Sequence, residues 1–540
     1  MSNRSRLMPI LLVLLTTLAI VQLSIAITNS SPSYEWFDPL IDVRGVLVDR
    51  FVKVPDEDEM QQAAIEAMIE SLDDPYALFV PDDMEDVFIK ELEGDYAGIG
   101  ARVNMIDGEL VIVTPMDDSP ALKAGIKAGD VVEFIDGEPA INTNLQQLIE
   151  QLTGPVGTNV VVSVRHKNSE KEDVTITRAQ IQSASIAGLI RRNKKWSWCL
   201  DDANGICYIQ IQQFNDNTPL ELAEALQAAE QELDIRGLVI DLRDNPGGAL
   251  SAAITISNMF LNKGTIVTVT GRAEPQRSWE AQQDHILRDV PVLILVNSHS
   301  ASASEIVAGS LQSNNRVAIL GTRTFGKGSV QEVLELESGG MLKFTSARYD
   351  LSNGRTIDKK LSEDKTLWGV DPNDGLVIPE TQTAYLERLQ NREPFTIITD
   401  DEPEAFICGD IDWIENTLGD FQLAQALIAV QRKLSSGQWP HLTDEKPVIH
   451  GIQANVTALA KERMGLIKQL SRIQKELNNL QNELEKEDVS LLPPNANLEN
   501  ALMTLTDSEG NQIGIWRIKD GDIEDALETL QLEPEVQKNE

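Results

Sequence analysis

Several residue types are scarce in this sequence, and each scarcity narrows the kind of protein it encodes. The 540 residues include 3 cysteines, whose positions lack the spacing of metal ligands and whose contexts do not suggest a thiol enzyme. The chain has 46 Lys and Arg residues and 85 Asp and Glu residues, so its net charge is -39. A charge of this sign repels the phosphates of nucleic acids. We therefore expect no metal site, no cofactor and no nucleic-acid partner.

Histidine is also rare, with 5 in the whole chain. No G-x-S-x-G elbow is present, and no histidine stands in a context that suggests a Ser-His-Asp triad. His299 adjoins a serine-rich stretch but has no obvious acidic residue to orient it. A serine nucleophile in this chain would therefore need a base other than histidine.

The cysteines leave two states open. Cys199 and Cys207 flank the turn-rich stretch LDDANGI, which suits the tip of a hairpin, and Cys408 stands alone. A cross-strand disulfide between the first two is compatible with an oxidising compartment, and free buried thiols are the ordinary alternative.

Long apolar runs are absent except at the N-terminus. Leu7–Ile27 carries no charge and is close to the length of a membrane-spanning helix, and Arg4 and Arg6 before it favour an N-terminus on the inside. Small residues at Ser24–Ala26 suit signal-peptide cleavage, so residues 1–27 are predicted to be either a removed signal peptide or a retained anchor. In both cases the rest of the chain lies outside the cytoplasm, in the periplasm or cell envelope or anchored at the inner membrane.

The length of the chain indicates several domains, and its patterning changes along the way. Residues 34–93 are predicted to be helical, because Ala64, Ile65, Met68, Ile69 and Leu72 share one face of a helix over Gln61–Leu72. The stretch LDDPY at Leu72–Tyr76 ends that helix.

Short strands, glycine turns and one helix alternate over residues 94–170. The ordered set YAGIGARV, ELVIVTPM and AGIKAGDVVEFIDG resembles a PDZ domain. The resemblance places the carboxylate-binding loop at Ala97–Gly100, so that Gly98, Ile99 and Gly100 would hold the C-terminal carboxylate of a peptide through backbone N–H groups. A small β domain that binds nothing is the alternative.

Residues 171–392 alternate apolar strands with helices, which favours an α/β layered domain around a buried sheet. Within it, the strand of Gly237–Gly248 ends in the turn DNPGG, and VPVLILV at Val290–Val296 is followed by SHSASASEIVAG. Ser300, Ser302 and Ser304 all stand where a strand gives way to a helix, a place that exposes a hydroxyl to the N–H groups of the first helical turn. A serine there is more often only a helix cap.

A lysine in a glycine-rich turn strengthens the catalytic interpretation. Lys327 lies in GTRTFGKGSVQ, 25 positions after Ser302, and a desolvated lysine can act as the base of a serine nucleophile. A second S-x-x-K match at Ser362–Lys365 lies in a charged loop with no strand before it, and we discount it. Glu305 suits a capping partner in the first helical turn rather than a catalytic acid.

SASASEIVAG and TFGKGSVQ, preceded by LVIDLRDNPGG and a PDZ-like stretch, resemble the C-terminal processing, or tail-specific, proteases over roughly residues 35–435. The resemblance implies a multidomain α/β protein whose protease core is related to crotonase and ClpP, with an inserted PDZ domain. It also implies a nucleophile, a base and a glutamine that orients the base, together with two oxyanion donors from backbone N–H groups. These residues would be Ser302, Lys327, Gln331, Gly248 and Ala303, in that order.

The implied activity is that of an extracytoplasmic serine endopeptidase that forms an acyl-enzyme and recognises apolar C-terminal tails of proteins or peptides through its PDZ domain. Tail binding is expected to activate the enzyme as well. A catalytically inactive PDZ-containing scaffold is the main alternative, although a binder would not need Ser302, Lys327, Gln331 and NPGG together. A crotonase-like acyl-processing protein is less favoured, because its thioester substrates would be scarce outside the cytoplasm.

The C-terminal part lies outside the resemblance. Residues 393–435 are predicted to be an acidic linker and an amphipathic helix at Gln422–Leu434. Residues 450–487 carry apolar residues at alternating steps of three and four, which predicts a coiled-coil hairpin or dimer helix. It would bind an adaptor, self-associate or simply form a solvated hairpin. Residues 488–540 are an acidic tail with a small strand, IGIWRI.

Overall fold

The computed structural model describes part of the chain, in the ranges 35–85, 88–89, 96–141, 143–167, 170–181, 184–273, 275–282, 290–360, 367–400, 407–446, 502–506 and 512–517. The predicted N-terminal segment and the predicted coiled coil lie outside the described residues. No helix within these ranges is long and apolar enough to cross a membrane.

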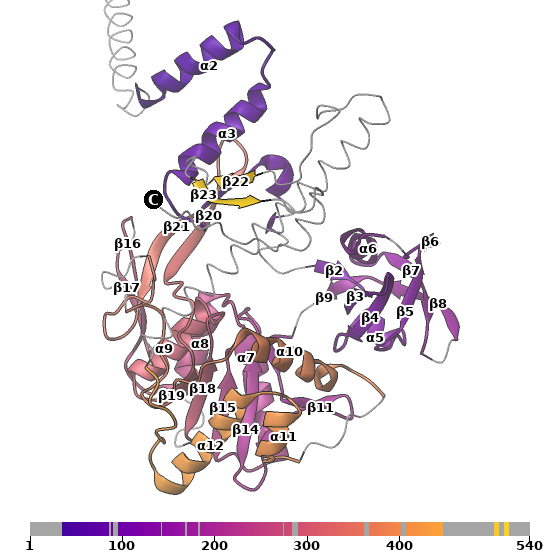
Figure 1. The fold of residues 1–540 in the computed structure, drawn as a ribbon, viewed down its shortest axis with the longest axis vertical. Coiled ribbons are helices and arrows are strands. Elements are labelled where there is room, and N and C mark those ends of the chain that lie inside the picture. Colours follow the sequence, from indigo (N-terminus) through magenta and orange to yellow (C-terminus); the bar gives the residue numbers. More distant parts are fainter. Residues whose placement is uncertain are drawn as a thin grey trace, which may run out of the picture.

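A six-stranded sheet forms the centre of the larger domain (Figure 1). Four neighbouring strands run parallel in the order β14-β15-β18-β19, and β10 and β13 pair antiparallel with β14. Their bounds are β10 (Ile186–Ala187), β13 (Cys199–Asp201), β14 (Ile206–Ile211), β15 (Gly237–Asp241), β18 (Val292–Val296) and β19 (Val317–Gly321). The strands predicted from GLVID, VPVLILV and VAILG are therefore confirmed, and they lie side by side.

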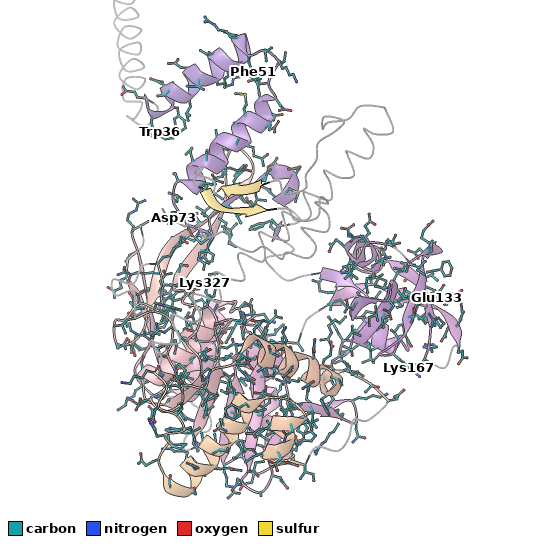
Figure 2. The ribbon with its side chains drawn as sticks, in the orientation of Figure 1. Trp36, Phe51, Asp73, Glu133, Lys167 and Lys327 are labelled. Atoms are coloured by element: carbon teal, nitrogen blue, oxygen red, sulfur yellow. The ribbon has the colours of Figure 1, made fainter. Side chains whose placement is uncertain are left out.

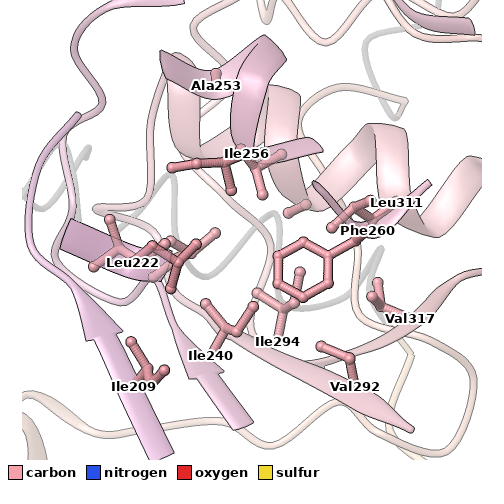
Figure 3. Close-up of a cluster of buried hydrophobic side chains, with 14 of the residues drawn as sticks. Ile209, Leu222, Ile240, Ala253, Ile256, Phe260, Val292, Ile294, Leu311 and Val317 are labelled. Carbon is pink, nitrogen blue, oxygen red and sulfur yellow. The ribbon is translucent and has the colours of Figure 1, made fainter. Parts of the chain in front are cut away.

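Helices cover both faces of this sheet. The helices on one face are α7 (Thr218–Glu232), α8 (Leu250–Phe260) and α9 (Ala303–Ser313), and those on the other are α11 (Ile411–Asn416) and α12 (Phe421–Ser436). Side chains alternate along each strand, so Ile240 lies in the first core and its neighbour Val239 in the second. Figure 3 shows the first core, where Ile240 and Ile294 lie beneath Leu222 and Phe260.

The predicted amphipathic helix at Gln422–Leu434 is confirmed, and it has a larger structural role than a linker helix. It forms α12, whose side chains fill the second core between the sheet and solvent; they include Leu423, Ala424, Leu427 and Val430. The sequence pattern gave the helix and its apolar face but not the sheet that the face covers.

A second, antiparallel sheet stands over the first domain and joins distant parts of the chain. It contains β1 (Leu78–Val80), β16 (Thr265–Gly271), β17 (Arg277–Glu280), β20 (Ser329–Glu335) and β21 (Met341–Asp350). β20 and β21 form a long hairpin, and β1 pairs with β21 so that Leu78 lies opposite Lys343. The segment after LDDP is thereby fixed to the same hairpin that follows Lys327.

A smaller β domain lies between residues 96 and 181. Its main sheet has the order β3-β4-β5-β7-β8, with β6 paired to β5, and β2 pairs with β9. The bounds are β2 (Tyr96–Gly98), β3 (Ala101–Ile106), β4 (Glu109–Pro115), β5 (Val131–Ile135), β6 (Glu138–Pro139), β7 (Asn159–Arg165), β8 (Lys171–Thr177) and β9 (Ala179–Ile181), with helices α5 (Pro120–Lys123) and α6 (Leu145–Leu152). Because β8 pairs along β7, this sheet continues past residue 170.

Polar contacts join the smaller domain to the larger one. The Arg191 guanidinium donates two hydrogen bonds to the Asp117 carboxylate, at 3.0 and 2.5 Å, and the Ile398 N–H donates to the Thr114 hydroxyl at 3.0 Å. Arg191 belongs to the hairpin of β11 (Ile190–Arg192) and β12 (Lys195–Ser197), and Ile398 follows α10 (Gln382–Thr396). These described contacts are polar, as is common between domains of one chain that move relative to each other.

The remaining elements are η1 (Glu35–Phe37), α2 (Asp38–Arg50), α3 (Glu57–Glu70), η2 (Asp82–Met84) and the paired strands β22 (Leu502–Thr506) and β23 (Gln512–Arg517). The N-terminal helices α2 and α3 contain no buried residue, although the sequence predicts an apolar face on the second. Met68 is 47% and Leu72 63% exposed, whereas Ile65 and Ile69 are half-buried, so the described part of the chain covers that face only in part.

All three cysteines are free thiols, which decides between the two states that the sequence leaves open. Cys199 and Cys207 do lie opposite each other on β13 and β14, as a hairpin requires, but no disulfide joins them. Burial raises the pKa of the Cys207 thiol, so it stays protonated.

Candidate active site

The candidate nucleophile stands on a strained turn between β18 and α9. Ser302 has φ 56° and ψ -115°, a backbone conformation that residues with a side chain rarely adopt. Such a conformation persists only where the surroundings hold it, and it is typical of functional sites. The helix begins at the next residue, Ala303, so the strained residue lies directly at the helix N-terminus.

The structure separates the three serines that the sequence treats alike. The Ser300 hydroxyl donates to the Leu242 carbonyl at 2.7 Å, the Ser304 hydroxyl donates to the Asn245 carbonyl at 2.9 Å, and both serines are completely buried. Ser302 is half-buried, and its Oγ lies 2.9 Å from the Tyr349 hydroxyl. Two of the serines therefore tie loops together, and only Ser302 keeps its hydroxyl beside another side-chain hydroxyl.

The glycine turn after β15 packs directly against the nucleophile. A Cβ on Gly247 would lie 2.7 Å from Ser302 Cβ and 2.9 Å from the Ala303 nitrogen, and a Cβ on Gly248 would lie 1.9 Å from the Phe214 carbonyl oxygen. Both glycines have positive φ, 101° and 141°. Glycine is needed at both positions because the two backbones approach too closely for any side chain.

This close approach presents two backbone donors beside Ser302. Within the described ranges, the N–H groups of Gly248 and Ala303 have no hydrogen-bond acceptor. By contrast, the neighbouring Gly247 N–H donates to the Asn245 side chain at 2.8 Å. Unpaired N–H groups on both sides of a serine are what an oxyanion intermediate requires.

The candidate base lies on a loop that reaches the nucleophile from the other side. The Lys327 N–H donates to Glu305 Oε2 at 2.8 Å, and the ammonium nitrogen lies 4.5 Å from the centre of the Tyr76 ring. Burial lowers the pKa of the Lys327 amine, and nearby Lys343 lowers it further, which favours the neutral form that a base needs. No hydrogen bond joins Lys327 to the Ser302 hydroxyl among the residues that the structure describes.

Gln331 lies on β20 near this loop without contacting the lysine. Its side-chain amide donates to the Ser329 hydroxyl at 2.9 Å and to the Thr345 hydroxyl at 3.4 Å. Ser302, Lys327, Gly248 and Ala303 are thus gathered around one turn, whereas a hydrogen bond from Gln331 to the lysine is not seen in the described structure.

Glu305 does more than cap a helix. Its buried carboxylate accepts four hydrogen bonds; the donors are the Ser302 N–H, the Thr324 hydroxyl, the Gly326 N–H and the Lys327 N–H. Burial raises its pKa to about 7, although these hydrogen bonds act in the opposite direction. The predicted capping contact is present, but the same carboxylate also holds the lysine loop against the nucleophile turn.

Tyr349 is a residue of the site that the sequence did not indicate. It lies on β21, is 4% exposed, and donates its N–H to the Gly328 carbonyl at 2.9 Å, next to Lys327. Burial raises the pKa of its hydroxyl, which therefore keeps its proton. Nothing in a strand sequence signals which residue will face a serine on another element, so this contact comes only from the tertiary structure.

His299 has an acidic partner, which corrects the expectation from the sequence. Its Nδ1 lies 3.0 Å from Asp244 Oδ1, and Arg388 also contacts Asp244. Asp244 lies in the DNPGG turn, far from His299 in the sequence, which is why inspection of neighbours missed it. The pair joins the nucleophile turn to the glycine turn, while the Ser302 hydroxyl contacts Tyr349.

The predicted tail-binding loop also has unpaired donors. Gly100 has φ 72°, and the N–H groups of Ile99 and Gly100 have no hydrogen-bond acceptor within the described residues. The Ile99 carbonyl accepts from the Ala121 N–H at 2.8 Å, which points the Gly100 N–H of the same peptide plane the opposite way, and the Gly100 carbonyl accepts from the Met116 N–H at 2.9 Å. Gly98 ends β2, just before this turn, and the following strand β3 lies at the edge of its sheet.

No group of three or more His, Cys, Asp and Glu side chains that could hold a metal ion occurs in the described ranges.

Comparisons with known proteins agree with the two domains. The model of Peptidase family S41 matches residues 205–374, and the model of the PDZ domain matches residues 97–177. The carboxy-terminal-processing protease of Bartonella bacilliformis is 32% identical over 346 residues, which cover 63% of this chain and 77% of that protein. The carboxy-terminal processing protease CtpA of Bacillus subtilis is 31% identical over 353 residues, which cover 65% of this chain and 71% of that protein.

A solved structure of a photosystem II D1 C-terminal processing protease aligns with 63% of this chain and 86% of its own, at 26% identity and a TM-score of 0.38. The family of this chain is therefore assigned from the sequence relatives and the family models alone.

Proposed function

Because this chain belongs to the carboxy-terminal processing proteases of peptidase family S41, a family of serine peptidases, we propose that it cleaves proteins by a Ser-Lys acyl-enzyme mechanism after binding their C-terminal tails. Ser302 is the nucleophile and Lys327 the general base. The observation that carries this proposal is the strained Ser302 with the unpaired N–H groups of Gly248 and Ala303 beside it.

The reaction would begin when the neutral Lys327 amine takes the proton of the Ser302 hydroxyl. The serine oxygen attacks the peptide carbonyl, and the N–H groups of Gly248 and Ala303 donate to the oxygen that becomes negative. The lysine returns its proton to the leaving amine, which leaves an ester on Ser302. Water then gives a proton to the same lysine and attacks the ester. As the bond to Ser302 Oγ breaks, the lysine returns this proton to the serine oxygen and the new C-terminus is released.

The described arrangement corresponds to a resting state in this proposal, because no hydrogen bond joins Lys327 to the Ser302 hydroxyl within the described residues and the Lys327 ammonium contacts Tyr76. Turnover requires the amine and the hydroxyl to come within hydrogen-bond distance, and it requires Gln331 to move from Ser329 if it is to orient the lysine. Binding of a tail is the event that we propose to favour this rearrangement.

The tail would bind at the PDZ domain, with its carboxylate at the N–H groups of Gly98, Ile99 and Gly100 and its backbone along the edge of β3. Apolar tails are the proposed ligands. The support is the glycine loop with its unpaired N–H groups and the position of β3 at the edge of the sheet.

We further propose that the core has the crotonase and ClpP-like arrangement, supported by its parallel strands with helices on both faces. The proposed domain division is the one predicted from the sequence, with the PDZ domain extended to Ile181 because β8 pairs with β7 and β9 pairs with β2. An extracytoplasmic location rests on Leu7–Ile27, and association through residues 450–487 rests on their heptad pattern.

The proposal is tested by incubating the full chain, purified in mild detergent, with a reporter protein that ends in an apolar tail. We expect tail-dependent cleavage by the natural sequence, and losses of at least about 1,000-fold for both Ser302→Ala and Lys327→Ala, because each removes a group that forms or activates the nucleophile. Mass spectrometry of the products identifies the new C-terminus.

The matched control is Ser362→Ala, which removes the serine of the second S-x-x-K sequence and is expected to leave cleavage unchanged. Cleavage that survives Ser302→Ala would exclude this serine as the nucleophile. Tail binding without cleavage by any form would favour a peptide-binding scaffold.

A further inference from the structure

The stretch LDDPY has no role in the mechanism so far, yet the structure fixes it beside the candidate base. β1 pairs with β21 through Leu78 and Lys343, and the Thr345 N–H donates to Asp74 Oδ2 at 3.3 Å. Lys360 donates to the Asp73 carbonyl at 2.6 Å. Figure 2 shows Asp73 near the upper part and Lys327 near the lower part of the β20–β21 hairpin. An N-terminal segment is thus held on the wall of the active site.

Tyr76 is the residue of this segment that contacts the machinery. Its N–H donates to Asp74 Oδ1 at 3.0 Å, which fixes the backbone from which the side chain projects. Its ring centre lies 4.5 Å from the Lys327 ammonium nitrogen, within the range of a cation–π contact. Tyr76 is itself half-buried.

Charged groups surround the lysine from several elements. Lys343 on β21 opposes its positive charge, while Glu305 on α9 and Asp74 in the N-terminal segment favour that charge. Asp358 acts on Tyr76 from a further loop. The effects of these positive and negative charges on the amine partly cancel. Desolvation of the amine by burial is the leading cause of its lowered pKa.

We propose that Tyr76 is a positioning residue for the base: its ring covers the Lys327 amine, excludes water from one side of it and limits the directions in which it can move toward Ser302. This inference rests on the proposed function, since it assigns a role in the Ser-Lys reaction. The N-terminal segment then completes the active site rather than merely preceding the PDZ domain.

The ring is expected to favour the neutral amine. An aromatic face attracts an ammonium by about 0.5–1 kcal/mol at an exposed site, whereas water solvates an ammonium far more strongly than any ring does. Replacing water by the ring therefore lowers the proton affinity of the amine. A variant without the ring should let water return, so that the amine holds its proton to a higher pH.

The test is the pH dependence of kcat/KM for cleavage of a tail peptide by the full chain. We expect Tyr76→Ala to move the acid limb of the profile about one pH unit upward, which lowers kcat/KM below the limb about tenfold while cleavage recovers at alkaline pH. Tyr76→Phe keeps the ring and should leave the limb in place.

Leu78→Ala is the matched control, because Leu78 belongs to the same segment and pairs with β21 but its side chain is 37% exposed. A limb that stays in place in Tyr76→Ala, or one that moves equally in Tyr76→Phe or Leu78→Ala, would overturn this inference alone. Cleavage that does not depend on Ser302, measured in the same series with Ser302→Ala, would overturn the proposed function and this inference with it.

Discussion

The nucleophile turn of the core and the glycine loop of the PDZ domain both present unpaired backbone N–H groups, but they are supported very differently. The nucleophile turn is held by the four hydrogen bonds of the buried Glu305 and by the buried hydroxyls of Ser300 and Ser304. The loop at Ile99 and Gly100 is held by two backbone hydrogen bonds to its carbonyls.

The difference matches what each region is proposed to do. Donors that stabilise a transition state must already be aligned before the reaction, because reorienting them would add to the barrier. Donors that hold a peptide carboxylate need only a concave loop and an accessible edge strand, and ligands with different tails can then fit. Changes in the first region should therefore alter kcat and stability, while changes in the second should alter KM.

Among the changes that test this comparison of the two supports, the largest effect is expected from Glu305→Gln. The carboxylate oxygens of Glu305 accept four hydrogen bonds, and the amide NH2 of glutamine would replace one of these oxygens by a donor that faces donors. We therefore expect kcat to fall at least about 100-fold and the free energy of unfolding to fall by about 1–3 kcal/mol. Steady-state kinetics and urea unfolding measure the two effects.

Glu221→Gln is the matched control for that change. Glu221 also accepts hydrogen bonds from the core, from the Ser185 N–H and hydroxyl at 2.7 and 2.8 Å, but it contacts none of the candidate catalytic residues. It should lower stability with little change in kcat. Equal losses of kcat in both variants would mean that Glu305 acts through general stability and not by holding the two loops.

Tyr349→Phe should have a smaller effect in the same region. The phenol is the side-chain hydrogen-bond partner of the Ser302 hydroxyl, and its loss removes one neutral hydrogen bond, so we expect kcat to fall about tenfold with KM nearly unchanged. A raised kcat would instead show that the Tyr349 hydroxyl keeps the Ser302 hydroxyl away from Lys327, so that Tyr349 would inhibit the nucleophile and not support it.

The smallest effect is expected in the PDZ loop, from Gly100→Ala. Alanine at φ 72° is strained, and its Cβ would lie 2.5 Å from Ser119 Cβ, so KM for a tail peptide should rise about tenfold while kcat stays within about twofold. Fluorescence anisotropy of a labelled tail peptide, in the Ser302→Ala background, measures binding directly.

Gly98→Ala is a comparison within the same loop, since alanine keeps the backbone N–H proposed to bind the carboxylate and its Cβ would meet Thr153 at an ordinary 3.4 Å. Binding should then change by less than about twofold. A loss of kcat without a loss of binding in Gly100→Ala would contradict the separation of the two regions and point to strong coupling between them.

Much of the site could be read from the sequence because it is built from local turns. DNPGG and SASAS each follow an apolar strand, and the resemblance to the tail-specific proteases implies that Gly248 and Ser302 belong to one site. In the structure the strands β15 and β18 are parallel neighbours, which brings the two turns to the same edge of the sheet. Residue type and spacing alone leave three serines equivalent, and the resemblance selects Ser302; the structure adds the physical reason, because the hydroxyls of Ser300 and Ser304 are buried in hydrogen bonds to backbone carbonyls.

Other parts could not be predicted because their partners lie far away in the chain. Tyr349 is separated from Ser302 by 47 positions, and the Asp244 partner of His299 by 55. The apolar face predicted on α3 shows the opposite limit, because its periodicity is clear although no residue of the helix is fully buried in the described structure and Met68 is 47% exposed. Periodicity says that a face is apolar but not what lies against it.

The sequence by itself determined the family, the alternation of strands and helices, and the glycine and serine turns, because these depend on residue type and spacing over short stretches. The tertiary structure decided that α12 covers the central sheet, that one carboxylate joins the nucleophile and lysine loops, and that an N-terminal tyrosine covers the lysine. Those relations depend on how the elements pack, and contacts between distant residues leave no mark in the local pattern of either one.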